Sequence, residues 1–362
     1  MNSNTLPYLL LTTILFSLGG CDIIANLSGQ NEAQVDQSEP LSAPLAFAVA
    51  PHIAWIPWYM AERENLFQQY SAQHKIQVEL IKDNYSDIID KFIKKEFHAI
   101  AISNIDAIAQ LVRREIEADV VLITNHHNGN EAVLLPNKAD TSAHNLRGKT
   151  FALVQYSASH YLFDRYLIRH QIPFNEIKIL DIPEADIPNA LINKKVYGVV
   201  TQNPNLYTLT QSGSAKIIFD SRQISNEIFD MIVIHRDVLA KYPQFAQVLL
   251  ATWFAIMQKL QGSKKGPTLD ELANLAGLSR TEYEAQLLTT PLNDTSTKAL
   301  ATIRDRRIKK TMRHIHYFIQ RHSLAGSNEI YSDWLSYPGR TPALLHFNGQ
   351  PLQKFVVPSA PK

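Results

Sequence analysis

Residues 45–67 read LAFAVAPHIAWIPWYMAERENLF, a short apolar run followed closely by a helical pattern. The run LAFAVA (45–50) has the length and composition of a buried β-strand. Pro57 stands at the first turn of the helical pattern, which extends to residue 67. The stretch therefore predicts a strand, a loop and a helix, the repeating unit of α/β folds.

The same alternation of strand and helix patterns continues to residue 235. Short apolar runs rich in β-branched residues predict the strands, and helical patterns lie between them. The predicted strands are 45–50, 76–80, 99–102, 120–124, 132–135, 150–154, 177–182, 197–200, 216–219 and 231–235. This order predicts parallel sheets covered by helices, and beyond residue 236 the pattern is mostly helical.

Length and charge narrow the class of protein. The 362 residues are enough for two packed domains, and the formal net charge is +1. Such a balance indicates neither nucleic-acid binding nor a strongly charged partner. Beyond the N-terminal region no hydrophobic stretch reaches the length that spans a bilayer, so we expect a soluble body.

The only cysteine, Cys21, ends an apolar run near the N-terminus. Residues 6–18 are too short to span a bilayer but fit the apolar core of a secretory signal. Residues 18–21 (LGGC) resemble a lipobox, the motif in which the chain is cut before a cysteine that then carries lipid. We expect a signal peptide over 1–20 and lipidation of Cys21; the alternative is a short buried helix with a stray thiol.

Residues 21–44 are polar, with little to bury, and predict a disordered tether. Asp22 resembles an inner-membrane retention signal, so the expected location is the periplasmic face of the inner membrane. With Cys21 acylated, the folded body has no thiol. This excludes disulfides, cysteine-based metal sites and a cysteine nucleophile.

Polar and aromatic residues follow the predicted strands, where open α/β sheets bind ligands. Trp55 and Trp58 follow the first strand and suit one wall of a pocket, or else the core. Ser103 and Asp106 have the spacing of a helix cap, which does not exclude contact with a ligand. Asn104 is the residue between them that is most free to reach outward.

The later strands add further candidates. Glu131 precedes an apolar strand and is expected at the edge of a cleft or in solvent. Ser157 and His160 lie at a helix start, where capping and ligand contact are both open. Gln202 offers an amide after the strand at 197–200, and Asp230 begins the strand that should return the chain to the first domain.

The ordered set AWIPWYMAERENLF, SNIDAI, LRGKTFALV and QYSASHYLFDRYL resembles solute-binding proteins of bacterial ABC importers. The group is the SsuA-like one that takes nitrate, sulfonates, taurine and thiamine-precursor pyrimidines, and the resemblance is strongest to members associated with urea and guanidine. Ile105 stands where those members have glycine, and Glu131 where they have aspartate. TQNPN (201–205) lacks their usual tryptophan.

The resemblance implies two α/β lobes around a cleft that closes on a ligand by hinge motion. It places lobe one at 45–134 and 236–340, lobe two at 135–235, and leaves 341–362 as a C-terminal tail. It also implies a monomer that works with a small-molecule solute and an ABC permease, without a cofactor.

The sequence is compatible with two classes of function and speaks against a third. In the first, the protein captures a small cationic or urea-like solute for an importer, because Asp106, Glu131 and Asp230 would favour such a ligand. A sulfonate, nitrate or pyrimidine-type solute is the alternative within this class. A sensor or interaction lipoprotein of the same fold is the second class, suggested by the basic segment RDRRIKKTMRH (304–314).

An enzyme is the third class, and the sequence speaks against it. It lacks a cysteine-rich iron motif, a GxSxG turn and zinc-hydrolase spacing. The adjacent His126 and His127 would point to opposite faces of a strand, so no metal site is expected there. His314 and His316 are two residues apart on a predicted helix and do not share a face.

Overall fold

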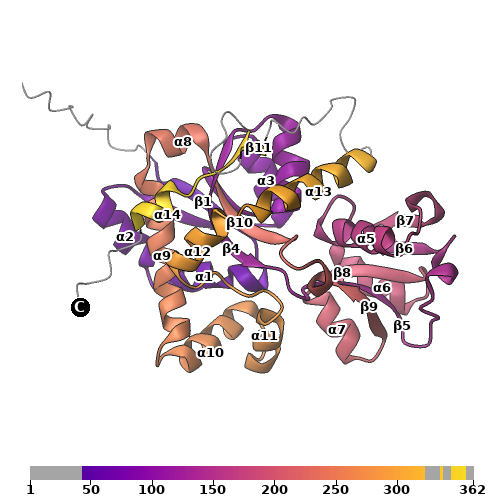
Figure 1. The fold of residues 1–362 in the computed structure, drawn as a ribbon. Coiled ribbons are helices and arrows are strands. Elements are labelled where there is room, and N and C mark those ends of the chain that lie inside the picture. Colours follow the sequence, from indigo (N-terminus) through magenta and orange to yellow (C-terminus); the bar gives the residue numbers. More distant parts are fainter. Residues whose placement is uncertain (1–42, 323–334, 337–343, 356–362) are drawn as a thin grey trace, which may run out of the picture. The chain divides into compact units, whose positions relative to one another are not determined.

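The computed structural model describes residues 43–322, 335–336 and 344–355 (Figure 1). The signal peptide, Cys21 and nearly all of the predicted tether lie outside these residues. Everything described belongs to one compact unit, Pro40–Lys362. Among the described residues, no helix combines the length and apolar character needed to cross a membrane.

Two sheets organise the fold, and we call the parts built on them the first and second lobes. The seven-stranded sheet of the first lobe has the order β11-β12-β4-β10-β3-β1-β2. Its strands are β1 (Leu45–Val49), β2 (Val78–Lys82), β3 (Ala99–Ser103), β4 (Ala118–His126), β10 (Phe229–His235), β11 (Leu335–Ser336) and β12 (Leu345–Phe347). β1, β3 and β10 are buried along their whole length, which explains why they read as continuous apolar runs.

The second lobe is built on a five-stranded sheet of order β7-β6-β8-β5-β9. Its strands are β5 (Glu131–Pro136), β6 (Thr150–Leu153), β7 (Lys178–Asp181), β8 (Gly198–Gln202) and β9 (Ala215–Asp220). All ten predicted strands are confirmed. The expectation of purely parallel sheets is wrong, because β10 runs antiparallel to β3 and β4, and β5 runs antiparallel to β8 and β9.

Strand pairing moves the junctions between the lobes away from the predicted ones. The resemblance places residues 131–134 in lobe one, but β5 pairs within the five-stranded sheet. It places residues 229–235 in lobe two, but β10 lies between β3 and β4 in the seven-stranded sheet. The chain therefore crosses between the sheets at 127–130 and at 221–228.

Helices surround the sheets as the alternation predicts (Figure 1). The helices of the first lobe are α1 (Ile56–Arg63), α2 (Leu66–His74), α3 (Tyr85–Ile93), α4 (Asn104–Asp106), α8 (Arg236–Lys241), α9 (Gln244–Gln261), α10 (Lys265–Ala276), α11 (Arg280–Leu287) and α12 (Ser296–Ile303). Those of the second lobe are α5 (Ala158–Arg169), α6 (Ile187–Ile192) and α7 (Asn205–Gln211). The single helix predicted at 57–67 is broken between α1 and α2, where Asn65 adopts a left-handed conformation with φ of 58°.

The C-terminal region is part of the fold. α13 (Arg307–Arg321) packs on residues of both lobes, the 107–111 turn and α5. β12 then pairs in parallel with β4, and α14 (Gln350–Phe355) packs on α9. The predicted tail thus contributes a strand, β12, to the first sheet and a helix, α14, to the packing of the first lobe.

Candidate functional site

The topology brings the ends of strands from both sheets to one pocket. Antiparallel β10 places Asp230 beside Ser103 and Asn125, at the edge where β3 and β4 end. In the second lobe, Glu131 pairs with Gln202 at the end of β8. The pocket between these edges has a volume of about 200 Å³. It is lined by His52, Trp55, Tyr85, Ser103, Asp106, His127, Val154, Ser157, Ala158, Ser159, Glu184, Gln202 and Asp230.

Asp106 is the buried carboxylate of the helix that follows β3. Its Oδ2 accepts hydrogen bonds from the Ser103 hydroxyl (2.6 Å) and the Tyr85 hydroxyl (2.8 Å). Ser103 also caps the helix by accepting from the Asp106 N–H (3.0 Å). Burial raises the pKa of Asp106 to about 6, against the opposing effect of the two hydrogen bonds. No hydrogen bond from the described residues reaches Oδ1, so this oxygen is open to a ligand.

Asp230 is the second buried carboxylate. Its Oδ2 accepts from Asn125 (2.9 Å) and contacts His127 Nε2 (3.0 Å), while Oδ1 has no bond from the described residues. Burial alone would raise the pKa of Asp230, but the charge and hydrogen bond of His127, with the bond from Asn125, hold it below the usual value. The ionised form of Asp230, which lines the pocket, is therefore favoured.

His127 lies in the segment that crosses from β4 to β5, and it joins the two lobes electrostatically. Its Nδ1 contacts Glu131 Oε1 at the start of β5, and its Nε2 contacts Asp230 at the start of β10. Burial disfavours the charged imidazole, but the two carboxylates outweigh it and raise the pKa of His127 well above 6.5. The charged form of His127 is thus favoured between a carboxylate of each sheet.

Glu184 supplies a carboxylate from the second lobe. Its Oε1 accepts hydrogen bonds from the Thr201 hydroxyl, from Gln202 N–H (3.3 Å) and from the Asn205 amide (3.2 Å). No described residue bonds to Oε2. Burial raises the pKa of Glu184 against these hydrogen bonds. The open oxygens therefore come from both sides of the pocket.

An aromatic wall completes the first-lobe side. The rings of His52 and Trp55 stack with centroids 4.5 Å apart and an angle of 6°. Tyr85 packs 5.2 Å from His52 and 5.6 Å from Trp55. Burial lowers the pKa of His52, which favours its neutral form. The Trp55 indole N–H is buried and has no partner among the described residues.

The second-lobe side also contains the start of α5. The Ser157 hydroxyl donates to the Val154 carbonyl (2.7 Å) and caps the helix by accepting from the His160 N–H. Ala158 and Ser159 line the pocket from the first turn. Free N–H groups of a first turn attract negative charge.

The structure brings together five of the sequence-predicted residues as pocket lining, namely Trp55, Asp106, Ser157, Gln202 and Asp230. The other four lie elsewhere. Trp58 is in the core between Phe47 and Trp253. Asn104 turns inward, where its amide donates to the Glu227 carbonyl (3.0 Å) and accepts from the Phe229 N–H (3.2 Å).

Glu131 and His160 are placed behind the pocket rather than on its surface. Glu131 is fully buried and contacts His127, so it acts on the pocket through that residue. The His160 Nδ1 accepts from the Tyr156 N–H (3.1 Å), and its ring packs against Phe318 and His322.

Sequence reasoning missed His52, Tyr85 and Glu184 and gave His127 no role in the ligand site. His52 was visible in the PHIAW turn directly after β1, and Glu184 follows β7, so both obey the strand-end rule. Tyr85 follows β2 in the same way. Among the described residues, no group of three His, Cys, Asp or Glu side chains could hold a metal ion.

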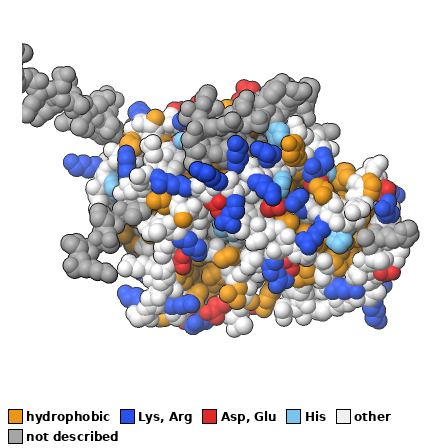
Figure 2. All heavy atoms as spheres, in the orientation of Figure 1, with side chains coloured by type: hydrophobic (Ala, Val, Ile, Leu, Met, Phe, Trp, Pro, Cys, Tyr) orange, Lys and Arg blue, Asp and Glu red, His pale blue; other side chains and the backbone are white. Residues whose placement is uncertain are grey.

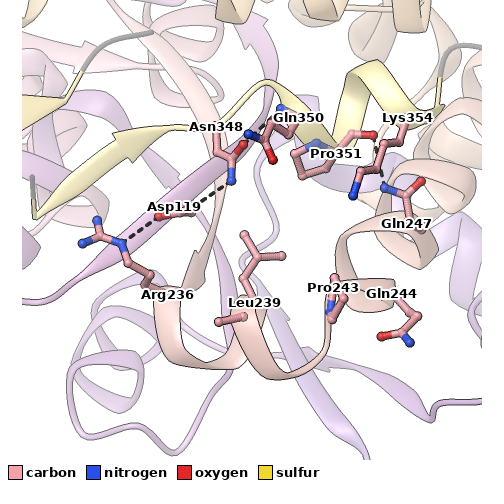
Figure 3. A pocket seen from close by; sticks show the side chains of 11 residues that line it. Asp119, Arg236, Leu239, Pro243, Gln244, Gln247, Asn348, Gln350, Pro351 and Lys354 are labelled. Atoms are coloured by element: carbon pink, nitrogen blue, oxygen red, sulfur yellow. Dashed lines mark hydrogen bonds and ion pairs between the residues drawn. The ribbon is translucent and has the colours of Figure 1, made fainter. Parts of the chain in front are cut away.

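A second pocket, of about 460 Å³, lies at the opposite edge of the first sheet, where β4 begins and β10 ends. Figure 3 shows Asp119 between Arg236 and Asn348, with hydrogen bonds of 3.0 and 2.9 Å. Gln247 donates to the Pro351 carbonyl (3.1 Å). These contacts fasten the β12–α14 segment to the sheet and give this pocket a structural role.

The two lobes and the pocket between them define the class of fold: this is the two-lobed α/β fold of periplasmic binding proteins. The chain belongs to the NMT1-like family, whose family model matches residues 37–276. No curated protein matches the sequence.

Several solved structures share the fold. The alkanesulfonate-binding protein SsuA from Xanthomonas axonopodis pv. citri, bound to MOPS, is 16% identical, with 78% of this chain and 94% of that chain covered and a TM-score of 0.63. The aliphatic sulphonate-binding protein SsuA from Escherichia coli is 16% identical, with coverages of 79% and 90% and a TM-score of 0.64. The Candida albicans CA3427 gene product is 14% identical, with coverages of 80% and 93% and a TM-score of 0.60.

Proposed function

We propose that the protein is the solute-binding component of an ABC importer and captures a small cationic or urea-like solute without chemical conversion. The family and the two-lobed fold support the binding role. The signal-like segment and Cys21 support attachment by lipid to the periplasmic face of the inner membrane. Closure of the two lobes on the solute would be the signal that a permease recognises.

The charge of the pocket is the observation that supports a cationic or urea-like ligand. Asp106, Asp230 and Glu184 each keep one carboxylate oxygen free of bonds from the described residues. No Lys or Arg is among the described residues that line the pocket, and the positive charge favoured on His127 is already paired with Glu131 and Asp230. A planar ligand rich in N–H donors, such as a guanidinium, would donate charge-assisted hydrogen bonds to these oxygens.

The aromatic wall fits the same ligand. A flat cation is attracted to the face of a tryptophan or tyrosine ring, and Trp55 and Tyr85 line the pocket. The unpartnered indole N–H of Trp55 could donate to a carbonyl oxygen, which urea has and guanidinium lacks. The small volume, about 200 Å³, favours a solute of only a few heavy atoms.

A sulfonate or other anion is the second candidate, and the start of α5 favours it. The backbone N–H groups near Ser157 and Ser159 would bind an anionic oxygen. An amino-sulfonate such as taurine carries both charges and could use this helix start and the carboxylates together. This alternative fits the sulfonate-binding proteins that share the fold, whereas the absence of Lys and Arg from the described lining weighs against a simple anion.

Thermal unfolding of residues 22–362 against a panel of solutes tests the proposal. The panel contains guanidine, urea, small amines, taurine, nitrate and an aminopyrimidine. A ligand at 100 times its Kd adds about 2.7 kcal/mol to the unfolding free energy, a shift of a few degrees. We expect guanidine, urea or an amine to raise the Tm, and Asp230→Asn to abolish that shift.

Asp119→Asn is the matched control, because Asp119 is also buried and paired but lies at the opposite edge of the sheet. It should lower the Tm and leave the ligand-induced shift intact. A shift with nitrate or taurine alone would replace the cation by an anion or an amino-sulfonate. No shift with any member of the panel would count against the proposed ligand class.

A further inference from the structure

A single helix carries an unusual concentration of positive charge. Residues 306–322 contain six basic side chains and no acidic one, although the whole chain has a formal net charge of only +1. The six are Arg306, Arg307, Lys309, Lys310, Arg313 and Arg321. Figure 2 shows Lys and Arg side chains gathered where Figure 1 places α13.

The helix has an apolar inner face and a basic outer face. Ile308, Met312, Ile315 and Ile319 are buried against the body. Three residues of the helix, Lys310, Arg313 and Tyr317, are exposed, and so is the N-cap residue Arg306. Their spacing of four, three and four residues aligns them in one stripe. The inner face already accounts for the folding role of α13, so the outer stripe needs a separate explanation.

Acidic side chains among the described residues do not neutralise this stripe. Arg307 is paired with Asp305, and Arg321 with Asp164. Arg306, Lys310 and Arg313 form no ion pair with any described residue. Ordinary soluble surfaces intersperse both signs of charge. A row of uncompensated cations beside an exposed tyrosine is typical of a surface that meets an anionic partner.

We propose that the exposed face of α13, defined by Arg306, Lys310, Arg313 and Tyr317, docks on the anionic phospholipid surface of the membrane that anchors the protein. This rests on the lipid attachment in the proposed function. A flexible chain of about 23 residues, the length of the predicted tether, has a root-mean-square length of roughly 25 Å. The body would therefore remain close to the headgroups, and a weak electrostatic contact would be enough to hold it there.

Sedimentation of the fragment 22–362 with lipid vesicles tests this surface. The fragment lacks Cys21 and retains the whole compact unit that contains the described residues. We expect it to bind vesicles containing phosphatidylglycerol and not vesicles of phosphatidylcholine alone. Binding should fall as salt rises, because salt screens exposed charges. Each basic residue near an anionic surface contributes roughly fivefold to partitioning.

The triple variant Arg306→Gln, Lys310→Gln, Arg313→Gln should therefore bind about a hundredfold more weakly. The matched control is Lys94→Gln, Lys138→Gln, Lys195→Gln, which removes the same charge from exposed sites elsewhere and should bind within a few-fold of the parent fragment. The proposal would be overturned if both variants lost affinity equally or if the fragment bound vesicles made only of phosphatidylcholine. It would also be overturned if the fragment did not bind anionic vesicles at low salt. Ligand-induced Tm shifts of the triple variant should be unchanged. The docking surface and the solute site are therefore tested independently.

Discussion

His127 Nε2 lies 3.0 Å from Asp230 Oδ2, which joins the segment between β4 and β5 to the start of β10 at the junction of the lobes. The other nitrogen of His127 contacts Glu131 on the second sheet. The buried charge that shapes the pocket is therefore also a link between the sheets. Movement of one lobe relative to the other would change the environment of Asp230, which faces the ligand.

Replacing His127 with Gln should lower the free energy of unfolding by about 3–5 kcal/mol, because two buried carboxylates would lose their counter-charge. The pKa of His127 in the folded state lies well above 6.5. Its stabilising contribution is therefore complete below pH 6.5 and is lost as pH rises through the folded value. In denaturant unfolding from pH 6 to 9, the free energy of unfolding of the native protein should decline as pH rises. The His127→Gln variant should lack this decline.

His74→Gln is the control for this measurement, because His74 is partly exposed. It should follow the pH profile of the native protein. The assignment would be wrong if His127→Gln and the native protein declined in parallel above pH 6.5.

Solute affinity should depend on the ionisation of Asp106. Burial raises its pKa to about 6, so the carboxyl is mostly ionised at pH 7 and mostly protonated at pH 5. If a cation binds only the ionised form, its affinity should fall about tenfold between pH 7 and pH 5. Isothermal titration across this range measures the change.

Asp106→Asn should weaken binding at pH 7 and flatten this part of the pH profile. A profile of unchanged steepness in Asp106→Asn would show that another group carries the pH dependence. Glu184 is that other group, since its pKa is also raised by burial.

The end of α13 should detach when Asp164 is neutralised. Buried Asp164 on α5 accepts from Arg321 Nε (3.3 Å) and contacts His322 Nε2 (2.9 Å). Asp164→Asn should cost about 1–3 kcal/mol and accelerate amide exchange in the last turn of α13. Asp305→Asn breaks the more exposed pair with Arg307 and should leave that exchange unchanged. Equal protection of the last turn in both variants would contradict this anchoring role.

Gly198→Ala should destabilise the second lobe. A Cβ atom at Gly198 would overlap Phe151 Cε1 and would lie 2.9 Å from the Leu134 carbonyl oxygen. Overpacking of this kind costs about 1–3 kcal/mol. Gly262→Ala is the control, because its nearest contact would be 3.4 Å, and it should change the Tm little. Similar Tm values for the two variants would contradict the close approach at Gly198.

Local sequence predicted the strands and the strand ends well. Apolar runs between turn residues located all ten predicted strands. A buried strand can be recognised from its own residues, without knowledge of its partner strand or of its register. The rule that ligands bind beyond strand ends then selected Trp55, Asp106, Ser157, Gln202 and Asp230, which all line the pocket.

The sequence did not predict the direction in which individual side chains point. Asn104 and Asp106 are two residues apart, yet Asn104 binds backbone groups at 227 and 229 while Asp106 faces the pocket. Trp55 and Trp58 are separated in the same way between pocket and core. Nothing in the local pattern distinguishes the members of these pairs, because the deciding contacts come from distant segments.

The sequence by itself determined the α/β class, the order of the predicted strands and the edge of the sheet at which a site would form. These properties follow from hydrophobic periodicity and chain connectivity, which are local. Only the tertiary structure decided that β10 enters the first sheet antiparallel between β3 and β4 and that His127 joins Asp230 to Glu131. Register and packing between distant segments fix those contacts, and with them the charge that the pocket offers to a ligand.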